Sequence, residues 1–216
     1  PSPLLVHPSS PGNPPSLLDE IKALLAYDIA NGASLSIINR LDRETSGVVL
    51  IAKNKETARR FGIAMQNREI EKEYVALVKG RPEKEKFTVD APILRAGEIY
   101  DSPIWVKQTV HPKGKACITD FELLEEKGSF CLLKAIPRTG RMHQIRVHAQ
   151  HVNLPIVGDK IYGGDDSCYL EFINTGWSKS LQSKLILPRQ ALHCRKMQLS
   201  KLESWEAPVP IEFKRF

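Results

Sequence analysis

The sequence lacks long hydrophobic runs, nucleotide-binding loops and a visible targeting segment. No apolar run approaches the roughly 18 residues that a membrane-spanning helix needs, so no membrane association is expected. The chain starts at Pro1 without a basic n-region or an apolar h-region, so the sequence predicts no signal peptide. Neither a GxGxxG motif nor a Walker-type loop occurs, and chemistry on a nucleotide cofactor therefore has no support.

Cysteine is also scarce. The four cysteines are Cys117, Cys131, Cys168 and Cys194, and they form no CxxC pair. The only close histidine is His193, beside Cys194. The cysteines are therefore predicted to be free, mostly buried thiols in a reducing cytoplasm.

The charge is moderately basic, with 31 Lys and Arg against 25 Asp and Glu in 216 residues, or a net charge of +6. This excess is compatible with a polyanionic partner but does not establish one. Its placement is more informative. Residues 138–151 contain three Arg, three His and no acid, and residues 40–60 contain six basic and three acidic residues. Both stretches also contain the motifs described below.

Three helices are predicted from local signals. The first begins at Ser16, which has the capping-box spacing to Asp19, carries an apolar stripe and closes at Gly32. The second is capped by Asn54 and has apolar residues on one face. The third runs from Arg141 to His151. Residues 1–15 are rich in Pro and Ser and are expected to be extended or irregular.

Strands are predicted where β-branched or alternating runs occur. These runs are Val48–Ala52, Tyr74–Val78, Thr119–Leu124, Phe130–Ile136 and Ala191–Leu202, and the third and fourth form a hairpin around Lys127-Gly128. Residues 83–116 are predicted to form hairpins and loops. Residues 164–188 are predicted to be an insertion or a surface excursion. Because strands and helices mix without a regular βαβ alternation, we expect an α+β fold with a mixed, mainly antiparallel β-sheet core flanked by helices and loops.

The stretch Asn39–Gly47, which reads NRLDRETSG, carries the first candidate for chemistry. It places Asp42 between Arg40 and Arg43, on a loop that leads into a predicted buried strand, and loops braced by a scaffold often hold reactive groups. Flanking cations keep an aspartate ionised, and an ionised aspartate can act as a nucleophile or a base. On local chemistry alone, a salt-bridged carboxylate in a polar loop is the simpler interpretation.

The second candidate stretch is Pro137–His148. In a helix starting at Arg141, His143 and Arg146 share one face, and His148 lies on another. The segment could point Arg146 at a carboxylate and offer cations to phosphates, although a solvated basic helix is the plain alternative. Metal binding is disfavoured, because there is no HExxH motif and no acidic ligand among these histidines.

Together with Lys72–Gly80, these stretches resemble the RluA family of RNA pseudouridine synthases. Asn39–Lys53 resembles the family pattern H-R-L-D-x-x-T-S-G followed by an apolar strand ending in A-K. Lys72–Gly80 resembles K-x-Y-x-A-x-V-x-G, and Arg138–His148 resembles R-x-G-R-x-H-Q-I-R-x-H. The three occur in the family's order, with lesser landmarks at 114–119, 155–162 and 191–193. The resemblance extends from about Leu5 to Pro210.

Two departures from the family pattern are visible. Asn39 stands where the family usually has His, which can alter loop hydrogen bonding but leaves Asp42 in place. Pro3–Ser9 looks like the tail of the family's first motif, whose first strand would then be missing from this chain. We expect residues 1–216 to form a single catalytic domain, without the separate N-terminal RNA-binding domain common in the family. Both a minimal form and an omitted segment are compatible with this start.

The resemblance implies an enzyme that isomerises specific uridines in structured RNA, ribosomal or transfer RNA, to pseudouridine without a cofactor or metal. Asp42 is then the nucleophile, Arg146 its ion-pair partner, and Tyr74 the residue that stacks on uracil and helps to remove a proton. The RNA-binding candidates are Arg40, Arg43, Arg138, Arg141, His143 and His148. A monomer in the cytoplasm is expected.

Two other functions compete with this interpretation. A non-catalytic RNA-binding or RNA-chaperone domain could have kept the scaffold and lost the reaction, but binding alone has no need of Asp42, Tyr74 and Arg146 together. A hydrolase working through Asp and His residues lacks metal ligands, a nucleophile elbow and a P-loop.

Overall fold

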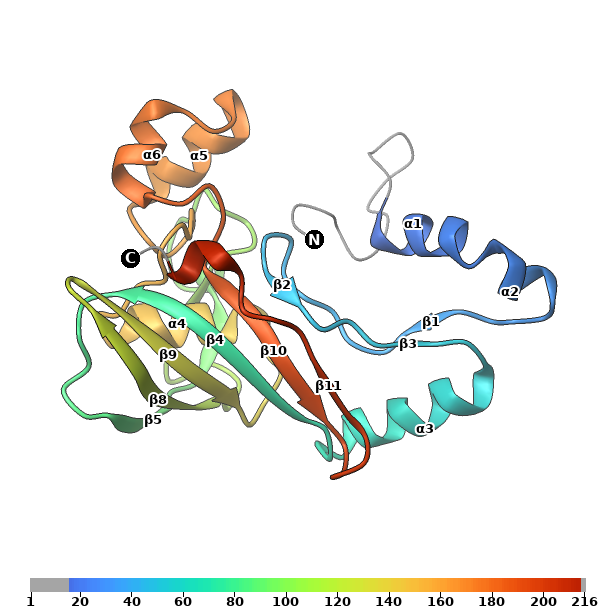
Figure 1. Cartoon of the computed structure of the whole chain (residues 1–216). Coiled ribbons are helices and arrows are strands. Elements are labelled where there is room, and N and C mark those ends of the chain that lie inside the picture. The colour runs from blue at the N-terminus through green and yellow to red at the C-terminus, as the bar shows by residue number, and fades with distance from the viewer. Residues whose placement is uncertain (1–15, 215–216) are drawn as a thin grey trace.

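The computed structural model describes residues 16–214, and the largest element of this part is a seven-stranded sheet (Figure 1). Along the sheet the strands follow the order β11-β10-β4-β9-β8-β5, and β2 pairs with β10. The strands are β2 (Ser46–Gly47), β4 (Glu71–Lys79), β5 (Lys86–Asp90), β8 (Ile118–Lys127), β9 (Phe130–Pro137), β10 (Leu192–Gln198) and β11 (Ser204–Glu206). Only the β2–β10 pair is parallel in this sheet. The predicted α+β fold with a mixed, mainly antiparallel sheet is confirmed.

The hairpin of β8 and β9 forms as its alternating sequence predicts. Its antiparallel register pairs Lys127 with Phe130, and Gly128 in the turn has a φ of 62°, which glycine adopts without steric cost. β4 lies between β9 and β10, so both of its edges are paired. Residues 75–78 of β4 are therefore buried on both faces and apolar throughout, as expected for a central strand.

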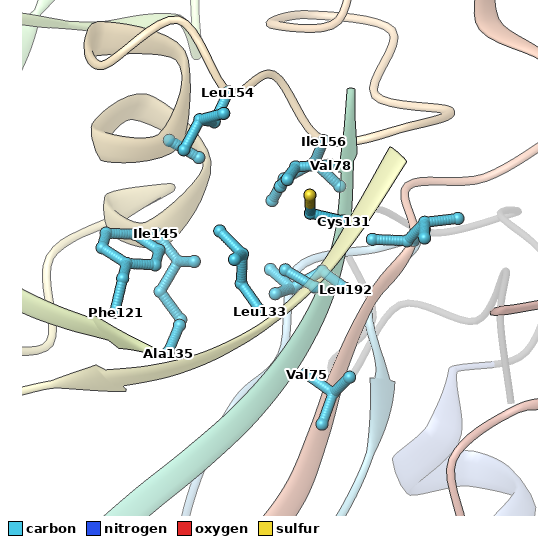
Figure 2. Packing of buried hydrophobic residues seen from close by; sticks show 14 of the residues in the cluster. Val75, Val78, Phe121, Cys131, Leu133, Ala135, Ile145, Leu154, Ile156 and Leu192 are labelled. Atoms are coloured by element: carbon cyan, nitrogen blue, oxygen red, sulfur yellow. The ribbon is translucent and has the colours of Figure 1, made fainter. Parts of the chain in front are cut away.

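The main hydrophobic core lies between this sheet and helix α4 (Gln144–His151). Figure 2 shows Phe121 of β8 and Leu133 and Ala135 of β9 facing Ile145 of α4. Ile145 is 6% exposed, so this packing fixes the helix on the sheet. Because Arg146 is the next residue, the same packing also fixes the backbone position of Arg146.

The first predicted helix is present but interrupted. Ser16 Oγ accepts a bond from the Asp19 N–H, and Asp19 Oδ2 accepts from the Ser16 N–H, which is the predicted capping box. The helix breaks at Leu25 into α1 (Leu17–Leu24) and α2 (Ala26–Ala30). Neither part has a buried residue, and Leu24 is 81% exposed, so the described part of the chain covers the apolar stripe only in part.

The second predicted helix is confirmed as α3 (Lys55–Gln66), with Asn54 Oδ1 accepting from the Thr57 N–H at 2.7 Å. Phe61 and Ala64 on its apolar face join a second cluster that includes Cys194 and Met197 of β10. α3 thereby attaches the N-terminal part of the fold to one end of the large sheet (Figure 1).

The prediction of a buried strand over Val48–Ala52 is wrong for most of that range. Only β3 (Ile51–Ala52) is a strand, and it pairs with β1 (Ser36–Ile37) outside the large sheet. The preceding residues cross between the two sheets, and their backbone groups bond elsewhere. The Val48 N–H donates to the Cys194 carbonyl, and the Leu50 N–H donates to the Asn39 side chain. Non-local partners thus replace the ladder that the β-branched residues favour.

The remaining elements follow the predictions more closely. Residues 83–116 contain β5, the pair β6 (Ile93–Arg95) and β7 (Gln108–Val110), and the 3-10 turn η1 (Ala96–Glu98). The predicted strand 191–202 is β10 followed by a turn into β11. The excursion 164–188 contains α5 (Asp166–Thr175) and α6 (Lys179–Leu185), and η2 spans Ile211–Lys214. All four cysteines are free and buried, as predicted.

The third predicted helix starts three residues later than expected, at Gln144. Thr139 and the Arg141 N–H both donate to Gln144 Oε1, and His143 has a left-handed φ of 56°. These bonds hold residues 139–143 in a turn, so His143 caps the helix and does not share a helical face with Arg146. Between residues 16 and 214, no helix has the length and apolar character needed to cross a bilayer. The predicted extended segment 1–15 lies outside the described residues.

Candidate active site

A cleft of about 570 Å³ opens between the loop that follows β1 and the turn that precedes α4. It is lined by residues 38–42 and 45, by 65, 72, 74 and 192, and by 137 and 139–146. Its size falls in the range of small-ligand pockets. Asp42, Tyr74 and Arg146 all line it, although they come from a loop, a strand and a helix.

Asp42 and Arg146 meet in this cleft. Arg146 Nη1 donates to Asp42 Oδ2 at 3.0 Å, which is the contact expected from the sequence. The Asp42 side chain is 28% exposed, whereas that of Arg146 is 5% exposed. The carboxylate therefore remains accessible to a ligand while its cationic partner is enclosed.

Arg146 is held by a second carboxylate, that of Asp159. Arg146 Nε and Nη2 donate to Asp159 Oδ2 and Oδ1 at 2.6 and 2.9 Å, a bidentate pair that fixes the guanidinium plane. Burial disfavours both charges, but their mutual attraction outweighs it, which raises the pKa of Arg146 and lowers the pKa of Asp159. Asp159 also accepts from the N–H groups of Ile161 and Tyr162 at 3.0 and 3.1 Å.

Asp159 was not among the site residues predicted from the sequence. The signal was present, since Gly158-Asp159 with Tyr162 stood out as a lesser family landmark. Its role was hidden because a fully buried carboxylate looks the same in sequence as an exposed one.

Tyr162 and His143 lie next to Arg146, and His143 also lines the cleft. The Tyr162 hydroxyl accepts from the Gln108 N–H at 2.8 Å and lies 2.9 Å from His143 Nδ1. The Tyr162 ring centroid lies 5.0 Å from the Arg146 guanidinium carbon. Burial, and then the nearby Arg146 cation, lower the pKa of His143 to about 4. His143 is therefore neutral near pH 7 and offers RNA a polar contact, not a cation.

The low pKa of His143 predicts an acid-sensitive fold. His143 takes up a proton near pH 6.5 in the unfolded chain but only near pH 4 in the folded chain. The stability that this neutral histidine contributes is therefore fully present above pH 6.5 and is lost as the pH falls towards 4. The loss has an upper bound of about 3 kcal/mol, and partial exposure reduces it. Urea unfolding at pH 7 and pH 4.5 should show a larger loss for the wild type than for His143→Gln. Equal losses would contradict the assignment.

Tyr74 and Lys72 contribute the β4 side of the cleft, and the two-residue period of a strand puts them on the same face. Burial, followed by the influence of Cys194 and Asp42, raises the pKa of the Tyr74 hydroxyl well above its usual value. Burial lowers the pKa of Lys72, and no ion pair of this lysine occurs within residues 16–214. Lys72 opens the motif Lys72–Gly80 but was not predicted as a site residue.

The predicted RNA-binding residues occupy different positions. Arg40 and Arg141 are exposed and line the cleft, and Arg43 is exposed but does not line it. Arg138 donates from Nε and Nη2 to both carboxylate oxygens of Asp120, at 2.5 and 2.8 Å. The positive charge of Arg138 is therefore already compensated by the Asp120 carboxylate.

The prediction that His148 contacts RNA needs correction, because this side chain is fully buried. Its Nδ1 lies 2.9 Å from Thr119 Oγ1, and its Nε2 lies 2.9 Å from the Ala91 carbonyl oxygen. Both ring nitrogens thus have protein partners, and the side chain joins α4 to the sheet. The predicted helix gave it an exposed face because the depth of α4 in the core is not visible in the local sequence.

Asn39, which departs from the family pattern, supports the loop that carries Asp42. Its Nδ2 donates to the Val48 carbonyl at 3.0 Å, and its Oδ1 accepts from the Leu50 N–H at 2.8 Å. The side chain is only 5% exposed, so it bridges the two ends of the loop from inside. In the part of the chain that the structure describes, no group of three or more His, Cys, Asp or Glu residues could hold a metal ion.

Comparisons with known proteins identify the family of the chain. The family model described as RNA pseudouridylate synthase matches residues 1–151. An uncharacterized RNA pseudouridine synthase of Chloroflexus aurantiacus is 37% identical over 99% of this chain and 63% of its own length. Ribosomal large subunit pseudouridine synthase D of Pseudomonas aeruginosa is 33% identical over 99% of this chain and 65% of its own length. The enzyme of the same name from Escherichia coli is 36% identical over 97% of this chain and 63% of its own length. The chain thus spans slightly less than two thirds of these curated relatives.

Two solved structures share the fold. Human RNA pseudouridylate synthase domain containing 4 aligns with a TM-score of 0.75 and 25% identity, covering 99% of this chain and 85% of its own. Human RNA pseudouridylate synthase domain containing 1 aligns with a TM-score of 0.66 and 22% identity, covering 90% and 74%.

Proposed function

Because the chain belongs to the RNA pseudouridylate synthase family, we propose that it converts specific uridines of structured RNA to pseudouridine, with Asp42 as the nucleophile. The observation that carries the proposal is the 3.0 Å contact between Arg146 Nη1 and Asp42 Oδ2 in an open cleft. It holds one short carboxylate oriented beside a cation and accessible to a ligand, which is what an aspartate nucleophile needs.

The reaction breaks the N1–C1′ bond of uridine, turns the uracil and joins C1′ to C5. Asp42 starts the cleavage, and Arg146 stabilises its charge from the enclosed side of the cleft. No cofactor is needed, because uracil is both the leaving group and the returning nucleophile. The Tyr74 ring stacks on uracil, and its raised pKa keeps the hydroxyl protonated at rest. Its hydroxyl oxygen can accept the C5 proton as its own proton passes to water in the open cleft.

The target uridine must leave its base stack to enter the cleft. Arg40 and Arg141 are exposed at the cleft and would neutralise phosphates on either side of the flipped nucleotide, with Arg43 further out. Arg138 would have to leave Asp120 first, which makes it the weakest of these arginines for RNA binding. The names of the relatives favour ribosomal RNA of the large subunit over transfer RNA as the substrate.

The proposal is tested by primer extension after carbodiimide treatment of RNA incubated with the protein. An unmodified transcript of the large ribosomal RNA should acquire a new stop at one or a few uridines. Bound but unmodified RNA would favour the non-catalytic alternative, and shortened RNA would favour the hydrolase.

Arg141→Ala should weaken RNA binding through the loss of one phosphate contact. The slope of log Kd against log salt concentration should fall by about 0.7 to 0.9, the value for one neutralised phosphate. Filter binding between low and moderate salt measures it. Arg81→Ala is the matched control, because Arg81 pairs with Glu126 and does not line the cleft. A wild-type slope in Arg141→Ala would remove this residue from the RNA-binding surface.

A further inference from the structure

We propose that Lys160 and Glu44 form a positioning pair that holds the loop carrying Asp42 in its reactive geometry. The inference rests on the proposed function and concerns how its nucleophile is placed. Neither residue lines the cleft, so neither is expected to touch RNA.

Lys160 is an enclosed cation with all three of its hydrogen-bond donors used. Its Nζ donates to the two carboxylate oxygens of Glu44 at 2.7 and 2.6 Å and to the Pro188 carbonyl at 2.6 Å. The side chains are 3% exposed for Lys160 and 15% for Glu44. Water therefore competes little for this pair, unlike for the ion pairs on the surface.

Glu44 belongs to the turn that begins at Asp42. The Thr45 N–H donates to the Asp42 carbonyl at 2.9 Å, so residues 42–45 form a β-turn with Glu44 as its third residue. The next residue is held as well, since Gln190 Nε2 donates to Thr45 Oγ1 at 2.7 Å. Fixing Glu44 therefore fixes the backbone from which the Asp42 carboxylate projects.

The other side of Lys160 is connected to the helical excursion. Its Nζ lies 4.2 Å from the ring centroid of Phe172 in α5 and 5.7 Å from that of Trp177, which precedes α6. The α5–α6 segment projects from the fold in Figure 1, away from α4 and β4. Its aromatic residues form a wall that leaves the Lys160 cation facing Glu44.

The residue before Lys160 is Asp159, which holds Arg146. Two neighbouring side chains thus fix the two partners of the same ion pair: Asp159 orients the Arg146 guanidinium, and Lys160 orients the loop of Asp42 through Glu44. A small shift of the 159–160 backbone would change the Asp42–Arg146 geometry from both sides. This arrangement points to positioning, because misplacement by about 1 Å is sufficient to cost roughly 100-fold in rate.

Lys160→Met removes the charge and keeps most of the side-chain volume. At saturating enzyme, on a large ribosomal RNA transcript that the wild type modifies, we expect the single-turnover rate constant to fall about 10- to 100-fold. The Kd for the same transcript should stay within about twofold, since Lys160 lies outside the cleft. Glu44→Gln, which keeps the side-chain shape, should fold even if Lys160→Met does not, and should give a smaller loss of rate.

The double variant Lys160→Met with Glu44→Gln distinguishes a positioning role of Lys160 from a purely stabilising one. It removes the uncompensated carboxylate and should recover the Tm lost in Lys160→Met, while the reaction stays slow. Lys107→Met is the matched control: Lys107 pairs with Asp166 of α5 but not with the Asp42 loop, so its loss should lower the Tm and leave the rate unchanged.

A wild-type rate in Lys160→Met, or a rate that returns together with the Tm in the double variant, would overturn the positioning role. In either case an active wild type would leave the proposed function standing. A wild type that forms no pseudouridine would remove the proposed function and this inference together.

Discussion

Asp42→Asn should reduce pseudouridine formation by about 10⁴-fold or more, the range found when a catalytic nucleophile is removed from an enzyme. The amide has the shape of the carboxylate but neither its charge nor its nucleophilicity. Arg146 keeps both bonds to Asp159 in this variant, so the wall of the cleft should not collapse. The Asp42 side chain is 28% exposed, and water can replace the lost acceptor.

The measurement is the rate of carbodiimide-dependent primer-extension stops under single-turnover conditions, together with the Kd for the same RNA. The Kd should change little, because Asp42 contributes no attraction to phosphates. Asp28→Asn provides the control, since Asp28 pairs with Lys53 and lies outside the lining of the cleft. Full activity of Asp42→Asn would end the nucleophile assignment, whatever the family of the chain.

Features with local causes were predictable from the sequence. The N-caps Ser16 and Asn54 bond to the third residue beyond them, and the hairpin of β8 and β9 needs only alternation and a glycine turn. The Asp42–Arg146 contact spans 104 residues and was predicted only through the family resemblance. Local chemistry at Asp42 favoured an ordinary loop carboxylate. The structure adds that its partner Arg146 is also held by a buried carboxylate, that of Asp159, which supports the proposed role of Asp42.

Features with non-local causes were missed. The run 48–52 has strand composition, but the Asn39 side chain and Cys194 take its backbone hydrogen bonds. His148 has the sequence context of a surface cation, yet it is buried against the sheet, where its two ring nitrogens lie within hydrogen-bond distance of Thr119 Oγ1 and the Ala91 carbonyl oxygen. In each case the deciding partner lies 11 or more residues away in the sequence, so no pattern within a short window contains it.

Arg146→Met should be the most destabilising of these substitutions. It leaves the Asp159 carboxylate, which has no exposed surface, without its cation, and breaking a buried ion pair on one side costs about 3 to 5 kcal/mol. Two backbone N–H groups still bond Asp159 and offset part of this cost. Chemical unfolding in urea measures the loss, and activity should disappear together with the orientation of Asp42.

The destabilisation should depend on pH in a defined direction. In the wild type Arg146 lowers the pKa of Asp159, so this pair contributes stability above the unfolded-state pKa and loses it as the pH falls. In Arg146→Met the carboxyl can become neutral, and the variant should therefore lose less stability than the wild type on acidification. Pairing Arg146→Met with Asp159→Asn removes the uncompensated charge, so the double variant should regain most of the free energy of unfolding without regaining activity. A single variant as stable as the wild type would mean that Asp159 does not depend on Arg146, and that the guanidinium serves Asp42 alone.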